Sequence, residues 1–316
     1  MSNARFRRPL FGAIGLLSLL AACGSDSNSP KPVNQWSSKA AMPTSRCCLA
    51  AAAENGTIYA MGGSSSSVVS LCTVEKYSGT ADSWSTAAAM PTCSSGAAAS
   101  VVNGIIYVMG GGGATVSNMN LAYDPAGNSW TPKAAMPTAR INLAADVING
   151  IVYAVGGYDT LNESATVEAY DPAANTWSTK APMPTARGAL GAGVINGKLY
   201  AVGGFSYASS SNLATVEVYD PATNTWTAKA PMPTARRGPG VAVLNGKLYA
   251  FGGVGSAGLV STVEVYDPAT NSWSTVAAMT TAKCCAGAAV LNGMAFAVGG
   301  TETGGVVVNS VDAYTP

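Results

Sequence analysis

Histidine is missing from this 316-residue sequence, and charged residues make up only 10% of it. Without histidine and without a Cys-x-x-Cys pair, the chain has no ligand spacing typical of a zinc site. Its 17 basic residues are balanced by 16 acidic ones, so no strong field attracts nucleic acid or an anionic membrane surface. We therefore expect no metal, no cofactor and no nucleic-acid partner.

The sequence also lacks an apolar run long enough to span a membrane. Its most apolar stretch, residues 10–20, follows three arginines, is too short for a spanning helix and leads into Leu-Ala-Ala-Cys at Cys23. This arrangement resembles the signal peptide and lipobox of a bacterial lipoprotein, which implies that residues 1–23 are the signal and that Cys23 is lipidated. Gly24 and Ser25, in place of aspartate, then imply the outer membrane or cell surface, with a lipid anchor as the membrane contact. An ordinary secretory signal with a chance cysteine is the alternative.

The dominant feature of the sequence is a repeat. Six tryptophans each stand 27 residues before the second glycine of a Gly-Gly pair, and five tyrosines each stand seven residues before the next tryptophan. The tryptophans are Trp36, Trp84, Trp130, Trp177, Trp226 and Trp273. Only the segment between Gly-Gly and the next tyrosine varies in length, from 12 to 15 residues. We therefore place the repeat domain at residues 34–316, after a flexible Ser/Pro-rich tether at residues 24–33.

Each repeat predicts four short antiparallel strands, which we name a to d. In one unit, strand a covers residues 190–195, strand b 198–202 and strand c 215–219, and strand d carries Trp226. Asn-Gly joins a to b and is a strong two-residue hairpin signal, while Asp-Pro ends strand c. The variable segment is the loop between b and c, so we expect this protein to differ from related proteins mainly there.

The closing Gly-Gly, the Tyr-Asp-Pro, the Trp seven residues after the Tyr and the Arg before the next strand resemble kelch repeats, whose period is about 50 residues. WD40 repeats have a similar length, but their Gly-His and Trp-Asp signatures are missing. The resemblance implies an all-β fold, a six-bladed β-propeller of four-stranded antiparallel blades. The repeats begin with a strand d at Trp36 and stop at a strand c at Tyr314, so we expect the N-terminal strand to complete the sixth blade.

Besides Cys23 the chain has six cysteines, and an even number in an exported protein predicts disulfides. They are Cys47, Cys48, Cys72, Cys93, Cys284 and Cys285. The two Cys-Cys pairs occupy the start of strand a in blades one and six, which ring closure would make neighbours, so a bridge between these blades is one option. Cys72 and Cys93 are expected near the same face. Free buried thiols are the alternative.

Basic residues stand just before strand a in five of the six units. They are Arg46, Arg140, Arg187, Arg236 and Lys283. Five cations around the mouth of a channel would suit a carboxylate or an acidic peptide. An acid, however, stands two residues before the strand-c tyrosine in the same five units, and the second unit lacks both charges. Because a lone buried charge is costly, this paired loss favours structural ion pairs over an anion-binding ring.

The best candidates for ligand binding lie outside the repeated positions. The b–c loops of blades three and four and the link into blade five supply Tyr158, Asp159, Phe205, Tyr207 and Arg237. In a four-stranded blade the b–c loops and d–a links emerge on one face, the loop face, where aromatic rings beside polar groups suit sugars or peptide side chains. We expect a non-catalytic cell-surface recognition module that binds an extracellular glycan or protein there. Ordinary anchoring of the loops is the alternative for these residues.

Two further classes of function stay open. Some kelch propellers are enzymes, among them copper-radical galactose oxidases and sialate epimerases, but the former need histidine ligands that this chain lacks. Asp146, a carboxylate in strand a where other units have small residues, is expected to bond channel water rather than to act in catalysis. A carbohydrate-active enzyme of unknown reaction and a structural or assembly lipoprotein are the alternatives, and the sequence does not fix an oligomeric state.

Overall fold

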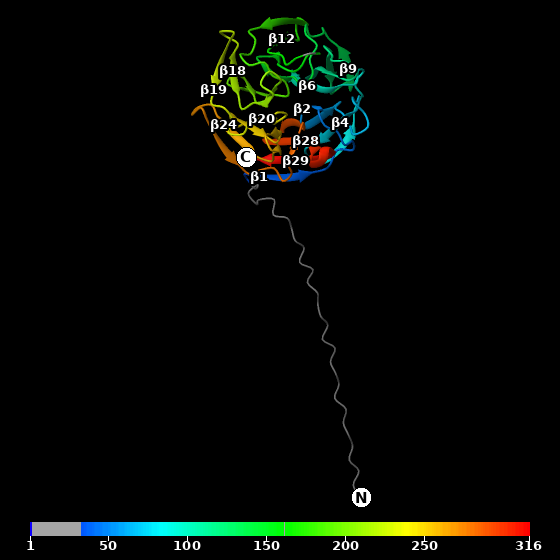
Figure 1. The fold of residues 1–316 in the computed structure, drawn as a ribbon. Coiled ribbons are helices and arrows are strands. Elements are labelled where there is room, and N and C mark those ends of the chain that lie inside the picture. Colours follow the sequence, from blue (N-terminus) through cyan, green and yellow to red (C-terminus); the bar gives the residue numbers. More distant parts are fainter. Residues whose placement is uncertain (2–32, 161) are drawn as a thin grey trace. The chain divides into compact units, whose positions relative to one another are not determined.

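Six blades of antiparallel strands surround a central channel in this computed structural model, which describes Met1, residues 33–160 and residues 162–316 (Figure 1). The predicted signal peptide after Met1, Cys23 and all but the last residue of the tether lie outside the described residues. No helix in the described ranges is long and apolar enough to cross a membrane.

Blades one to five each consist of four strands in chain order, a to d from the channel outward, with a short hairpin between b and c in blades four and five. They are β2 (Ala50–Glu54), β3 (Thr57–Met61), β4 (Val74–Ser78) and β5 (Ser83–Thr86); β6 (Ser95–Val102), β7 (Ile105–Gly112), β8 (Asn120–Asp124) and β9 (Ser129–Pro132); β10 (Ala144–Ile148), β11 (Ile151–Val155), β12 (Val167–Asp171) and β13 (Thr176–Lys180); β14 (Gly191–Ile195), β15 (Lys198–Val202), β18 (Val216–Asp220) and β19 (Thr225–Lys229); and β20 (Gly240–Leu244), β21 (Lys247–Phe251), β24 (Val263–Asp267) and β25 (Ser272–Val276). Strand b of each blade is buried at nearly every position, because neighbouring blades pack on both of its faces.

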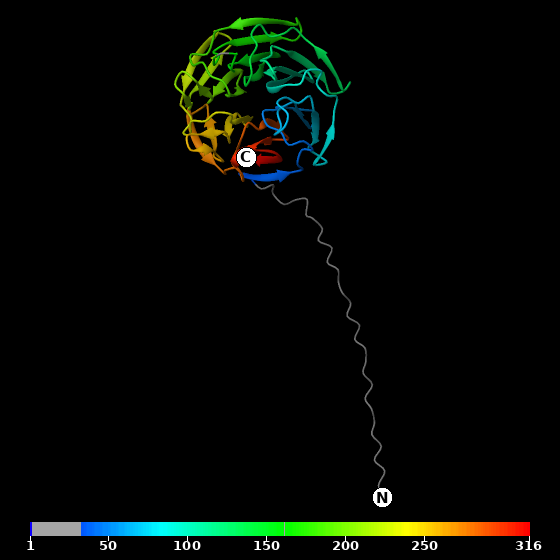
Figure 2. The same ribbon diagram turned by 45° about the vertical axis from the view of Figure 1, so that its right-hand side comes forward.

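The sixth blade combines the two ends of the repeat domain, as the sequence predicts. It contains β27 (Gly287–Leu291), β28 (Met294–Glu302), β29 (Val306–Thr315) and, as its outer strand, β1 (Gln35–Lys39). β1 pairs antiparallel with β29 and sets Trp36 opposite Tyr314, the register that the other blades show for their own Trp and Tyr. Figures 1 and 2 both show the blue β1 beside the red C-terminal strands. The N-terminal strand therefore closes the ring.

One contact set recurs at the outer edge of every blade. The strand-d Trp ring lies 4.9–5.4 Å from the strand-c Tyr ring, and its Nε1 donates to the carbonyl oxygen of an alanine that follows strand d of the preceding blade. Two residues before the Trp, an Asn side chain, or Asp82 in blade one, accepts the N–H of that alanine and the Tyr hydroxyl. Each blade is thus fastened to the one before it, and the same contacts hold the sixth blade to the fifth.

Several short elements lie on the loop face and in blade six. They are the hairpins β16 (Phe205–Ser206) with β17 (Ser211–Asn212) and β22 (Val254–Gly255) with β23 (Gly258–Leu259), the strand β26 (Lys283–Cys284) and the 3₁₀ turn η1 (Thr303–Gly305). The first hairpin lies in the longest b–c loop, for which the sequence predicts no strands.

Candidate functional site

The five predicted rim cations are buried inside the blades. The four arginines are 0% exposed and Lys283 is 1% exposed. Each pairs at 2.7–3.0 Å with the acid on strand c of its own blade: Arg46–Glu75, Arg140–Glu168, Arg187–Glu217, Arg236–Glu264 and Lys283–Asp312. Blade two has Ser94 and Leu121 at the two positions, both buried. Each side chain turns into its blade toward the carboxylate, so the structure contains the ion pairs that the paired loss in blade two favours and not the alternative ring of cations at the channel mouth.

Arg46 illustrates what these ion pairs hold together. Its Nη1 donates to the carbonyl oxygens of Gly62 at 3.1 Å and Thr73 at 2.8 Å, and its Nη2 donates to Glu75 Oε2 at 2.8 Å. Thr44 Oγ1 donates to the other carboxylate oxygen at 2.7 Å. Burial lowers the pKa of Arg46, and the neighbouring Glu75 opposes that shift. The pair ties the link before β2 to the end of β3 and the start of β4.

Six backbone positions, one from each blade, encircle the channel where it opens on the loop face. They are Cys48, Gly96, Asn142, Ala189, Gly238 and Cys285. All have a left-handed φ between 49° and 66°, and the N–H of each donates to the carbonyl oxygen of the equivalent residue in the preceding blade at 2.7–3.1 Å. We call this closed ring, which includes the step from Cys48 to Cys285 across the seam, the mouth circuit. It borders a cavity of about 160 Å³.

One pair of cysteines forms a disulfide. Cys72 precedes β4 of blade one and Cys93 precedes β6 of blade two, so the bond joins neighbouring blades. The other four cysteines carry free thiols and lie in the links before β2 and β27, not within strand a. Their vicinal Sγ–Sγ distances are 3.6 Å and 3.2 Å, well beyond the roughly 2 Å of a disulfide. All four cysteines are free, so a bridge between blades one and six is not formed; the N–H of Cys48 donates to the carbonyl oxygen of Cys285 at 2.8 Å across this seam, and the two thiols also interact.

Four of the five predicted ligand-binding residues line one cavity on the loop face. This cavity, the aromatic cleft, has a volume of about 360 Å³ and is lined by Tyr158 of blade three, Phe205 and Tyr207 of blade four, and Arg237 of the link into blade five. The Tyr207 ring lies 5.3 Å from that of Tyr158 and 5.2 Å from that of Phe205. The Arg237 guanidinium lies 5.0 Å over the Phe205 ring. The cleft continues into the mouth cavity, because the two share four residues of the mouth circuit.

Backbone hydrogen bonds position the side chains that line the cleft around the loop face. The residue after Gly-Gly pairs with the d–a link of its own blade, as Tyr158 does with Ile141 at N···O distances of 2.8 Å and 2.9 Å. Its side chain then reaches the link of the next blade. Tyr158 lies over Gly188, where a Cβ would collide with the ring, and Phe205 lies under Arg237 in the same way. The cleft therefore needs a residue without a side chain at Gly188.

Glu163 connects the loops of blades three and four. Its Oε1 accepts hydrogen bonds from Ser206 Oγ at 2.8 Å and from the N–H of Ala208 at 3.0 Å. The Ala208 amide is the largest cause of a lowered Glu163 pKa. Tyr207 stands between the two donors in the chain and is 60% exposed. Glu163 therefore positions the most exposed ring of the cleft.

Two other carboxylates that the sequence singled out act within the scaffold. Asp159 accepts the N–H of Asn162 at 2.8 Å in the turn of its own loop and does not line the aromatic cleft. Asp146 accepts the N–H groups of Val147 at 2.7 Å and Val194 at 2.8 Å, and burial raises its pKa to about 6. It thus links the inner strands β10 and β14 directly while lining the channel, and its bond to channel water stays a prediction.

Comparisons with known proteins assign the architecture to a family. A model described as the KLHDC2/KLHL20/DRC7 Kelch-repeats domain matches residues 143–316, more than half of the chain, and the Kelch motif matches residues 45–91 and 93–137. The chain belongs to the kelch-repeat family. This kelch propeller is also similar to the solved "Structure of YjhT", with a TM-score of 0.75 and 19% identity over 86% of this chain and 95% of that one, a likeness of fold alone. No curated protein matches it.

Reasoning from sequence missed two features of this kelch propeller. One is the hydrogen bonding of Glu163 across two loops. The other is a larger cavity on the opposite face, between blades four and five, whose signal is a lysine at the first position of strand b in two consecutive repeats, Lys198 and Lys247. Across the described ranges, no group of three or more His, Cys, Asp or Glu side chains is placed to hold a metal ion.

Proposed function

We propose that this kelch propeller is a non-catalytic recognition module that binds a glycan or a protein in the aromatic cleft. The observation that carries the proposal is the convergence of Tyr158, Phe205, Tyr207 and Arg237, four residues outside the repeated positions, from three blades into one cavity. Residues at repeated positions build the same blade each time. Residues outside those positions that line one cavity are not required by the fold, and ligand binding is a reason for them to lie together.

The chemistry of the cleft suits a ligand with a flat apolar face and polar edges. Tyr158, Phe205 and Tyr207 offer ring faces for a sugar or for an apolar or aromatic peptide side chain. Burial raises the pKa of Tyr158 to about 12, so its hydroxyl keeps its proton and can donate at neutral pH. Arg237 supplies a cation at the edge. We expect such a site to bind its ligand weakly when one propeller binds alone.

The proposal includes the location of the module. A lipid at Cys23 would hold the propeller at the outer membrane or cell surface, where many copies face the same glycan or protein surface and weak single contacts add to firm attachment. Replacing Cys23 with alanine and following the protein in membrane and soluble fractions tests this part. Unchanged membrane association would count against the lipid anchor.

The test of the cleft is binding to a combined glycan and peptide array, with the wild-type protein compared with Tyr207→Ala. Tyr207 is 60% exposed, so its loss should leave the melting temperature unchanged while binding to any array hit falls about tenfold. The matched control is Val69→Ala, which shortens an exposed apolar side chain, 73% exposed, in the b–c loop of blade one. It should bind as the wild type does.

A second variant acts through the scaffold. Gly188→Ala places a Cβ against the Tyr158 ring and should displace it, so binding should fall even though no proposed contact residue is changed. If array hits survive both variants, the cleft is not the binding site. If the array shows no hits, a structural or assembly role becomes the better reading, and turnover of a sugar library would favour the enzymatic alternative.

A further inference from the structure

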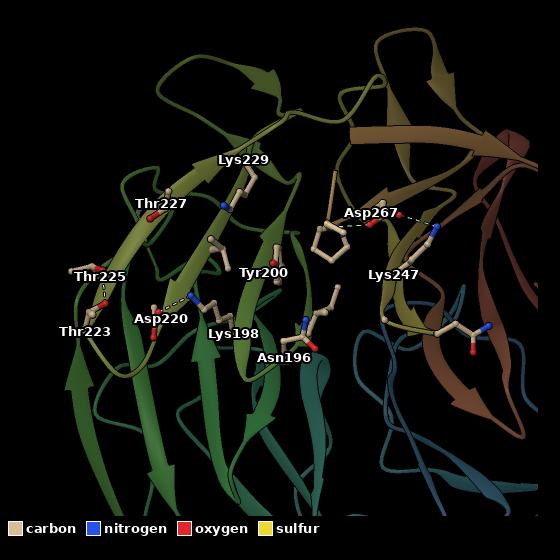
Figure 3. Close-up of a pocket in the computed structure, with 16 residues that line it drawn as sticks. Asn196, Lys198, Tyr200, Asp220, Thr223, Thr225, Thr227, Lys229, Lys247 and Asp267 are labelled. Carbon is tan, nitrogen blue, oxygen red and sulfur yellow. Dashed lines mark hydrogen bonds and ion pairs between the residues drawn. The ribbon is translucent and has the colours of Figure 1, made fainter. Parts of the chain in front are cut away.

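A cavity larger than the aromatic cleft lies away from it, on the face of the a–b and c–d turns, which we call the turn face. Its volume is about 490 Å³, and it is a groove between blades four and five (Figure 3). Blade four contributes one face of β15, β18 and β19, and blade five contributes its two turns. Tyr200, 6% exposed, forms part of the floor. The groove is thus a sheet face roofed by the neighbouring blade.

Charge is distributed unevenly in this turn-face groove. Lys198 Nζ pairs with Asp220 Oδ2 at 2.7 Å, and Lys247 Nζ pairs with Asp267 Oδ2 at 3.0 Å. Figure 3 shows these ion pairs on opposite sides of the cavity, with Tyr200 between them. The two carboxylates raise the pKa of each partner lysine. Both aspartates are therefore neutralised by lysines that stay charged through the neutral range.

A third lysine is left without a counter-charge. Lys229, at the end of β19, lines the same groove and takes part in none of the ion pairs between described residues. Beside it on the strand stands Thr227, and Thr223 and Thr225 share a hydroxyl hydrogen bond of 2.7 Å further along the groove. The groove therefore combines one uncompensated ammonium, threonine hydroxyls and a tyrosine ring.

The composition of this groove is specific to blades four and five. The first position of strand b is lysine only there; the other repeats have Thr57, Ile105, Ile151 and Met294. Lys39, Lys133 and Lys180 occupy the position of Lys229, three residues after the Trp, but none of them has a strand-b lysine in both its own blade and the next; beside Lys133 both positions are isoleucines. A repeat alone would not place two ion pairs and a free ammonium around one cavity.

We propose that the turn-face groove is a second binding site, for a hydroxylated ligand that carries one acidic group, a carboxylate or a phosphate. The acidic group meets Lys229, and the ligand hydroxyls exchange hydrogen bonds with the threonines and with the two lysine–aspartate pairs. This site is independent of the aromatic cleft, since no residue lines both cavities.

The test uses three probes that share one hydroxylated sugar ring: glucose, glucuronate and glucose 6-phosphate. Binding to the whole propeller is followed by saturation-transfer NMR and by calorimetric titration at millimolar probe concentrations. We expect one or both of the acidic probes to bind at low salt and glucose to bind at least tenfold more weakly. Lys229→Gln should weaken binding of the acidic probe about tenfold, because it removes the charge of one charge-assisted contact while keeping an uncharged polar side chain there.

Two controls separate this site from other sources of affinity. Lys133→Gln removes the matched lysine of blade two and should leave binding unchanged. Arg237→Gln removes the cation of the aromatic cleft and should also leave binding of the acidic probe unchanged. The proposal for the turn-face groove can therefore fail or succeed independently of the proposal for the aromatic cleft. Equal binding of all three probes, equal losses in Lys229→Gln and Lys133→Gln, a loss with Arg237→Gln alone, or no binding of either acidic probe would each overturn the proposal.

Discussion

Arg187 and Glu217 represent the five buried ion pairs of the propeller. Their Nη2 and Oε2 atoms lie 2.9 Å apart, and Thr185 Oγ1 donates to the second carboxylate oxygen at 2.8 Å. Burial is the main cause that lowers the pKa of Arg187, to about 10, so the guanidinium stays charged at neutral pH. Replacing such a pair with apolar residues of the same size changes the free energy of unfolding little. Removing only one partner is strongly destabilising, because the other charge then stays buried without compensation.

We therefore predict that Arg187→Met lowers the free energy of unfolding by roughly 3–5 kcal/mol. The double variant Arg187→Met/Glu217→Leu imitates blade two, which has no charge at either position, and should cost less than the sum of its two single changes. The expected coupling, measured by urea unfolding, is on the order of 0.5–3 kcal/mol. The exposed pair Lys198–Asp220 serves as control, because its removal should leave the free energy of unfolding nearly unchanged. Additive losses at Arg187 and Glu217 would contradict the structural role.

At the scale of elements, the β16–β17 hairpin is held by one side chain from the neighbouring blade. Glu163 accepts the amide of Ala208 and the hydroxyl of Ser206, so the hairpin that carries Tyr207 is ordered from outside. Among the described loops, the β22–β23 hairpin of blade five has no comparable contact from a neighbouring side chain, so it offers an internal comparison.

Replacing Glu163 with alanine should speed hydrogen exchange in residues 205–212 while residues 254–259 and the melting temperature stay unchanged. The pH dependence follows from the carboxylate: its pKa in the folded state is lowered, so the contact is present above the ordinary glutamate pKa of about 4.3 and is lost as pH falls through the lower folded value. The Ala208 amide resonance should therefore titrate below that pH. An exchange rate unaffected by Glu163→Ala would mean that the hairpin orders itself.

Strands could be predicted well from this sequence, whereas the directions of side chains could not. Asn-Gly and Asp-Pro bound the strands in nearly every repeat, and β14 and β18 begin only one residue after the predicted positions. Arg46 occupies the same place in the repeat whether its side chain faces the channel or the blade, so spacing alone could not decide between rim and interior. The contact between Tyr158 and Tyr207 depends on the conformations of two loops that differ in sequence, so no repeat pattern predicts it.

For the whole molecule, stability depends on a seam between residues far apart in the chain. Trp36 of β1 packs on Tyr314 of the same blade and on Phe251 of blade five, and Asn34 accepts the hydroxyl of Tyr314 and the N–H of Ala277. In every other blade the Trp and the Tyr that it packs on are only seven residues apart in the chain. The seam can therefore open at the N-terminal strand without breaking the chain.

Deleting residues 24–40 should consequently expose the edge of β29, lower the melting temperature and promote aggregation, because an unpaired strand edge can pair with other chains. Deleting residues 24–31 keeps β1 and should change neither. Circular dichroism melts and size-exclusion chromatography of both truncations measure the difference. Two truncations that melt together with the parent would show that the other contacts of blade six suffice.

The mouth circuit has an electrostatic consequence. Its six N–H groups all point the same way around the channel, each satisfied by a carbonyl of the same set. Bond dipoles arranged head to tail in a circle cancel, unlike those of a helix, which add along its axis and leave free amides at one end. The channel entrance is therefore neither a positive nor a negative pole, and it presents no spare amide to an anion. Any preference for charge at the aromatic cleft must come from side chains, such as Arg237 and the nearby Glu163.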